Sequence, residues 1–99
     1  MPNPDRSLRS PVGYKYQDFY IPDRMCGAII RYVEHGLKPG SFLQAVIQNN
    51  LSNACAFGDY ENIKNLPAYA HFFYNEVPGD CWGSKDKMNA WIKRFEEVD

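Results

Sequence analysis

The stretch Ser41–Ala54, SFLQAVIQNNLSNA, decides the fold class of this chain. At about 100° per residue in an α-helix, its apolar side chains fall within one arc. These side chains are Leu43, Val46, Ile47, Leu51 and Ala54. The stretch therefore predicts a helix that begins at Gly40 or Ser41, ends near Phe57-Gly58 and turns this arc toward a core.

Asn50 lies in the middle of this apolar arc, where a buried amide without partners would cost about 1–3 kcal/mol. Two interpretations stay open. The amide can bond a neighbouring helix end or loop backbone, or the face can open onto a pocket or subunit interface. Asn49 and Asn53 flank the same side and would enlarge such a polar patch.

Upstream of this stretch, the spacing predicts a helix from Pro22 or Asp23 to His35. Asp23 is suited to cap its first N–H groups, and Gly36 is suited to the left-handed residue that ends a helix. The apolar stripe of this helix consists of Met25, Ile29, Tyr32 and Val33.

Downstream, a third helix is predicted from Tyr60 to Glu76, with Asp59 as its N-cap. Pro67 lies inside it, so a kink or a break into two short helices is expected. The predicted core stripe consists of Ile63, Leu66, Ala70, Phe73 and Val77.

Phe72 points away from that stripe, on a face that also holds Asn65, Ala68, His71 and Asn75. An aromatic side chain on such a face is suited to contact another chain, so Tyr69, His71 and Phe72 are candidate interface residues. The alternative is a Phe72 covered by the N-terminal segment.

A fourth helix is predicted from the Ser84 cap through Val98, with an apolar stripe of Met88, Trp91, Ile92, Phe95 and Val98. Residues 1–21, with three prolines and Gly13, predict an extended arm that straps the helical core or exchanges with another subunit. The predicted fold is all-α: a compact bundle of about four short helices in one domain, residues 22–99, behind this arm.

Composition narrows the function. The chain has 99 residues and a net charge of −1, which argues against a protein that grips duplex nucleic acid. It has no apolar run long enough to span a membrane and no secretory signal, so a cytoplasmic location without membrane contact is expected. Two histidines and three widely spaced cysteines predict no metal site, and no HExxH, GxSxG or Gly-rich phosphate loop occurs. We expect no enzyme activity and no cofactor.

Three blocks of sequence suggest a family: YVEHG at 32–36, PGSFLQAV at 39–46 with NNL at 49–51, and CWGS at 81–84. With Gly58-Asp59, Asn62 and Phe73-Tyr74-Asn75, they resemble a set of small, functionally unassigned proteins encoded by phages and prophages. The resemblance covers roughly residues 19–95. Those proteins tend to carry Asn-Asp where this chain has Asn49-Asn50, so a carboxylate is replaced by an amide here.

The resemblance implies a protein that acts by occupying a target. One class is an oligomeric counter-defence protein that sequesters a nucleotide-type immune signal. Its polar, aromatic pocket would use Asn49, Asn50, Asp59, Asn62 and Trp82, with Arg24 or Arg31 on the phosphate. The role of Asp59 and Asn62 can equally be to cap the third helix.

The competing class is a stoichiometric inhibitor of a host defence complex, similar to an anti-CRISPR protein, with Tyr69 and Phe72 among its contact residues. A weaker alternative is a helix-turn-helix regulator. The recognition helix of such a regulator would be the stretch 42–54, which has no Arg or Lys for DNA.

Overall fold

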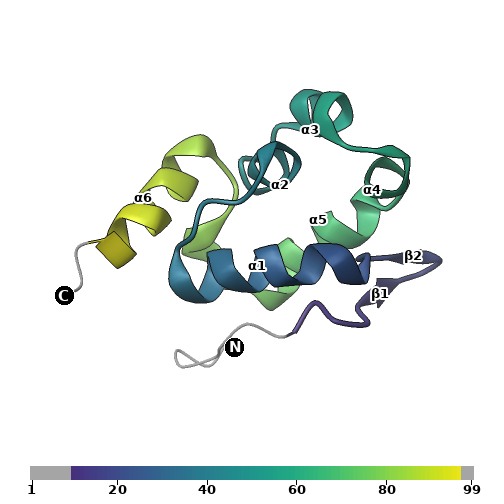
Figure 1. The fold of residues 1–99 in the computed structure, drawn as a ribbon, viewed down its shortest axis with the longest axis horizontal. Coiled ribbons are helices and arrows are strands. Elements are labelled where there is room, and N and C mark those ends of the chain that lie inside the picture. Colours follow the sequence, from purple (N-terminus) through teal and green to yellow (C-terminus); the bar gives the residue numbers. More distant parts are fainter. Residues whose placement is uncertain (1–9, 97–99) are drawn as a thin grey trace.

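The computed structural model describes residues 10–96, which form short helices behind a two-stranded hairpin (Figure 1). The hairpin pairs Lys15 with Tyr20 and Tyr16 with Phe19 in antiparallel register. In chain order the elements are β1 (Lys15–Tyr16), β2 (Phe19–Tyr20), α1 (Asp23–His35), α2 (Ser41–Ile47), α3 (Leu51–Phe57), α4 (Tyr60–Lys64), α5 (Leu66–Glu76), the 3-10 turn η1 (Gly79–Cys81) and α6 (Lys85–Glu96).

The mostly helical fold class is confirmed, but the prediction of about four helices is wrong. Residues 10–96 contain six α-helices because two of the predicted helices are each divided in two. None of these six has the length and apolar character needed to cross a bilayer.

The predicted helix of residues 41–57 breaks after Ile47. Asn49 adopts a left-handed conformation with φ 61°, and Asn50 becomes the N-cap of α3. Asparagine tolerates the left-handed region and bonds nearby backbone, so an Asn-Asn pair favours a break of this kind. The break turns α3 away from the direction of α2, and Leu51 leaves the core, with 69% of its surface exposed.

The predicted break near Pro67 is confirmed: α4 ends at Lys64 and α5 begins at Leu66. The predicted core face of α5 is wrong in part. Ala70 is exposed, whereas Tyr69 and Phe72 are fully buried. The reason is that the hairpin packs on one side of α5 while α2 packs on another, so α5 is buried on two sides.

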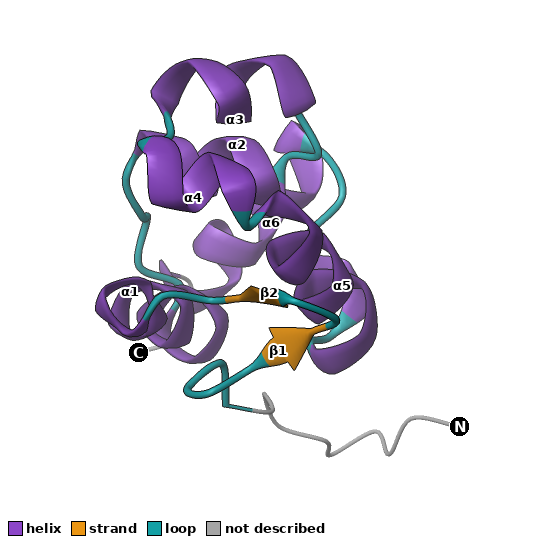
Figure 2. Ribbon diagram, turned by 90° about the vertical axis from the view of Figure 1, so that its right-hand side faces the viewer, coloured by secondary structure: helices purple, strands orange, loops and turns teal. Residues whose placement is uncertain are grey.

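The part of the arm that the structure describes is therefore a strap, not a straight extended segment. Figure 2 shows the hairpin beside α5. The Tyr14 ring meets Phe72 edge to face, with ring centroids 5.1 Å apart. Phe72 is thus covered by the N-terminal segment of its own chain, which was the alternative to a contact surface at Phe72. The first nine residues of the predicted arm lie outside the described residues.

The predicted bounds of α1 are confirmed, but Asp23 is not its cap. Pro22 occupies the N-cap position without a side-chain bond, and Asp23 is the first helical residue. Gly36 ends the helix with φ 67°, and a Cβ there would clash with the ring of Phe95 on α6. Glycine at this position therefore permits both the left-handed turn and the close approach of α6.

The Ser84 hydroxyl accepts a bond from the Lys87 N–H at 3.1 Å, which confirms the predicted cap of α6. Met88 and Trp91 are buried, and the Trp91 indole N–H donates to the Tyr32 carbonyl at 3.1 Å. The described helix ends at Glu96, so the predicted continuation through Val98 lies outside the described residues.

Candidate binding site

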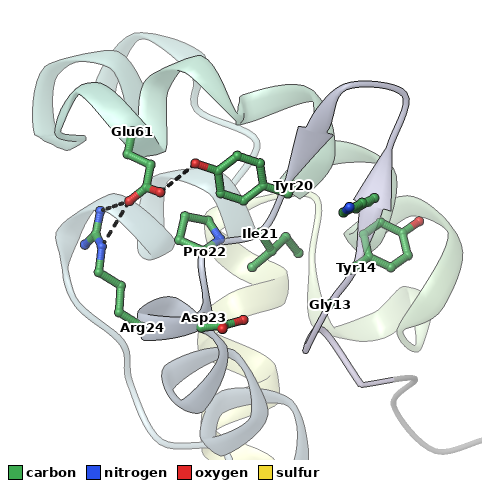
Figure 3. A pocket seen from close by; sticks show the side chains of 9 residues that line it. Gly13, Tyr14, Tyr20, Ile21, Pro22, Asp23, Arg24 and Glu61 are labelled. Atoms are coloured by element: carbon green, nitrogen blue, oxygen red, sulfur yellow. Dashed lines mark hydrogen bonds and ion pairs between the residues drawn. The ribbon is translucent and has the colours of Figure 1, made fainter.

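A polar cluster joins the hairpin to α1 and α4, as Figure 3 shows. The Arg24 guanidinium donates to the Asp59 carboxylate at 2.7 Å and to the Glu61 carboxylate at 3.2 Å. The Tyr20 hydroxyl donates to the other oxygen of Glu61 at 2.7 Å. Arg24 therefore carries two carboxylate partners already, and a phosphate would have to displace them.

The pKa shifts in this cluster follow from the same contacts. The bond to Glu61, followed by that to Asp59, raises the pKa of Arg24. The Asn62 backbone N–H, with help from Arg24, lowers the pKa of Asp59. The hydroxyl of Tyr20, followed by Arg24, lowers the pKa of Glu61. The three groups are thus held in their charged forms.

The side chains of Asp59 and Asn62, beside this cluster, both form hydrogen bonds within the fold. The Asp59 carboxylate accepts from the Asn62 N–H at 2.8 Å, which confirms the predicted cap of α4. The buried Asn62 amide oxygen accepts from the Tyr69 hydroxyl at 2.7 Å. These bonds favour the interpretation that Asp59 and Asn62 stabilise α4, since neither side chain points into an open pocket.

Asn65 is a residue of this cluster that the sequence did not single out. It is fully buried between α4 and α5. Its amide oxygen accepts from the Tyr20 N–H at 2.9 Å, and its amide nitrogen donates to the Glu61 carbonyl at 2.9 Å. The signal in the sequence is the break before Pro67, which leaves backbone groups for a side chain to satisfy.

A cleft of about 430 Å³ lies between the hairpin and the start of α1 (Figure 3). Its charged lining consists of Lys15, Asp23, Arg24 and Glu61. Two acidic and two basic side chains give it no preference for an anion, so it does not supply the phosphate site that the sequence predicted.

Asn49, Asn50 and Trp82 lie around a second, smaller pocket of about 90 Å³ between α2, α3 and α5. The Asn50 amide oxygen accepts from the Asn53 N–H at 3.0 Å, so Asn50 caps α3 instead of facing a helix core. Within residues 10–96, no lining residue of this pocket carries a charge. The structure thus brings these three predicted residues together but separates them from Arg24, Asp59 and Asn62.

The smaller pocket shares Ala70 and Trp82 with a shallow hollow of about 410 Å³, which we call the aromatic groove. Its other lining residues are Tyr16, Pro67, His71, Tyr74 and Asn75. The exposed ring of Tyr74 meets Trp82 edge to face with centroids 6.2 Å apart, and Tyr74 is 74% exposed.

His71 is fixed from two sides at the other end of the groove. The Tyr14 hydroxyl lies 2.6 Å from its Nδ1, and the Tyr16 ring stacks on it with centroids 4.0 Å apart. The hairpin therefore holds part of the groove wall in place before any partner binds.

Arg31, Tyr69 and Phe72 lie apart from these pockets. Arg31 is exposed on α1, where its guanidinium lies over Gly27 of the same helix. Tyr69 and Phe72 are fully buried in the core, so neither offers a contact surface on the folded chain, in contrast to the prediction. Of the three predicted interface residues, only His71 lines a surface hollow.

The described residues contain no cluster of three or more side chains that could hold a metal ion. Cys26 and Cys81 are buried and Cys55 is exposed. Burial raises the pKa of the Cys26 thiol, and it raises the pKa of Cys81 to about 12, which keeps these two thiols protonated.

No family model, curated protein or solved structure matches this chain.

Proposed function

We propose that this chain is a non-enzymatic binding protein that holds an apolar segment of a partner protein in the aromatic groove. The observation that carries the proposal is the groove itself: one exposed and several partly buried aromatic rings surround a hollow that no Asp, Glu, Lys or Arg of the described residues lines. Trp82 is partly buried and contacts Phe73 from the core side, with ring centroids 6.4 Å apart. Rings that are already oriented lose little conformational entropy when a partner binds.

The chemistry of the groove fits a protein segment better than a nucleotide. Aromatic side chains with few charges are typical of the centre of protein interfaces. Among the described residues, the groove and the adjoining pocket are lined by no Lys or Arg. A nucleotide would leave its phosphate without a cation there, since Arg24 is occupied by Asp59 and Glu61.

The resemblance to phage-encoded proteins suggests the class of partner. Such a protein would act in the bacterial cytoplasm and bind a host defence protein in a fixed ratio, as an anti-CRISPR-like inhibitor does. Sequestration of a nucleotide-type signal is the competing proposal. It draws on the meeting of Asn49, Asn50 and Trp82 at one pocket, where two amides and an indole could hold a base.

A photo-cross-linking amino acid at Tyr74 tests the proposal in bacterial cells that express the protein. The control places it at Leu37, which is 53% exposed and lies between α1 and α2, outside the groove. We expect a discrete cross-linked protein from position 74 that is absent from position 37. Excess wild-type chain should compete for it, whereas Tyr74→Ala should compete at least about tenfold less well.

The competing proposal is separated by native mass spectrometry of the purified chain with added cyclic nucleotides. A nucleotide-bound mass would support sequestration and overturn the protein-binding proposal. The protein-binding proposal also fails if positions 74 and 37 give the same cross-links, because the groove would then have no selective contact.

A further inference from the structure

The fold leaves helix α3 almost uncovered. Ala54 alone among its seven residues is buried, where α3 packs on α2. Figures 1 and 2 both place α3 at the upper edge of the molecule, above the hairpin. Among residues 10–96, six large hydrophobic side chains are exposed, and three of them are Leu51, Phe57 and Tyr60. Exposed apolar side chains are thus concentrated on α3 and directly after it.

Charge is missing from the same region. The twenty residues from Pro39 to Gly58 contain no Asp, Glu, Lys or Arg, although these make up 23% of the chain. Depletion of charge together with exposed apolar side chains marks the centre of protein interfaces and not an ordinary solvated surface. The polar side chains that remain are amides and hydroxyls, each of which can both donate and accept hydrogen bonds.

These properties favour a second copy of the same chain as the occupant. A surface of single-sign charges would repel its own copy, whereas an uncharged surface of amides and apolar groups is compatible with itself. In a twofold dimer the same patch must serve both subunits. An uncharged face that can pair with itself meets this requirement.

The arrangement of side chains around α3 suits a helix pair. With Ala54 turned inward, the roughly 100° step per residue puts Ser52 and Ala56 on the outermost side. Leu51 lies with Cys55 on one flank, and Phe57 lies on the other. Each flank borders a hollow. Leu51 lines the pocket of about 90 Å³ described above, and Phe57 lines a different hollow of about 100 Å³ beside α2. Small residues on the ridge allow close approach, and hollows beside it can receive the ridge of a partner.

We infer that α3 forms the centre of a homodimer, in which it packs antiparallel against α3 of a second copy. In an antiparallel pair with a twofold axis, equivalent flanks lie on the same side. The two Cys55 thiols would therefore face one another across that side. The dimer surface is distinct from the aromatic groove, so each of the two proposals can fail without the other.

Cys55 supplies the test, because Cys26 and Cys81 are buried and Cys55 is the exposed thiol. We expect a short bismaleimide to convert the native protein into a covalent dimer, and Cys55→Ser to abolish the product. Native mass spectrometry of the untreated protein over a dilution series should show a dimer that dissociates.

Ala56→Arg should weaken this dimer by more than about tenfold, since it buries an unpaired charge at the contact. Arginine is a good helix former at an exposed position, so the variant should fold. The matched control is Ala90→Arg on α6, which is exposed and should leave the dimer unchanged. A chain that stays monomeric at every concentration, or a dimer that Ala56→Arg leaves intact, would overturn the inference.

Discussion

The hairpin end and the α3 end of the molecule differ in how their polar side chains are hydrogen-bonded. At the hairpin end, side chains from β2, α1, α4 and α5 bond to one another, and Asn62 and Asn65 are buried with partners. At the α3 end, the Asn50 side chain bonds the backbone of its own helix, and the apolar side chains of Leu51 and Phe57 remain exposed. One end is complete within a single chain, and the other has the composition of a surface that is completed by a partner.

The side chains that stabilise the fold thus lie mainly at the hairpin end, and those suited to contact a partner lie mainly at the α3 end. Full exposure of a leucine that could be buried forgoes roughly 1.5–3 kcal/mol. A continuous helix through Asn49 and Asn50 would place Leu51 on the same face as Leu43 and Ile47, and the break takes it off that face. We interpret the break as the device that moves apolar side chains from the core to a contact surface.

Substitution of Asn65 should have the largest effect on stability, because Asn65 links the hairpin to α4 through two buried hydrogen bonds. Asn65→Leu removes both amide bonds and leaves the Tyr20 N–H and the Glu61 carbonyl without partners. At about 1–3 kcal/mol for each of the two unsatisfied buried groups, we expect a loss of about 2–6 kcal/mol in the free energy of unfolding. Urea denaturation measures it.

The control for Asn65→Leu is Asn89→Leu on α6, where the side chain is exposed. This second variant should change the free energy of unfolding by less than about 0.5 kcal/mol. Equal losses in the two variants would show that the amide bonds of Asn65 contribute nothing specific to the hairpin end.

At the α3 end, a smaller effect is expected from Asn50. Asn50→Ala removes the cap of α3 and should cost about 1 kcal/mol. Asn50→Asp keeps an acceptor for the Asn53 N–H and should be nearly neutral. Thermal unfolding compares them, and a large loss in Asn50→Asp would show that the amide nitrogen is required.

The sequence predicts the helical fold class, the ends of α1 and the caps Asp59 and Ser84 because these depend on neighbours within four residues. It misses what depends on distant packing. Phe72 is assigned to a polar face because nothing in the local period reveals that Tyr14, far away along the chain, covers it. The placement of Asn50 inside one continuous helix is wrong for a different reason. Helical periodicity assumes a continuous helix, and the left-handed Asn49 ends that continuity.

The same limit applies to the candidate site. Asn49, Asn50 and Trp82 were proposed together and do meet, although Trp82 follows more than thirty residues later. The proposed phosphate partner Arg24 does not join them. Its carboxylate partners Asp59 and Glu61 come from another helix junction, and no spacing rule connects Arg24 to them.

The smallest expected effect comes from the exposed ion pairs of the complete end. The folded chain lowers the pKa values of Asp59 and Glu61 below their ordinary values of about 3.9 and 4.3. A lowered folded pKa means that the stabilisation is full above the ordinary values and is lost as the pH falls through the folded ones. Arg24→Gln should therefore lower the urea midpoint slightly at neutral pH and have no effect at a low pH where both carboxyls are protonated in the folded chain.

Arg31→Gln is the matched control, because it removes the same charge from an exposed position on α1. Within the described part of the chain, Arg31 has no carboxylate partner. Its variant should shift the urea midpoint by the same small amount at both pH values. If Arg24→Gln behaved in the same way, the cluster would owe its charged state to Tyr20 and the backbone N–H groups and not to the guanidinium. The hairpin end would then be held by neutral hydrogen-bond donors, and its contrast with the uncharged α3 end would rest on burial alone.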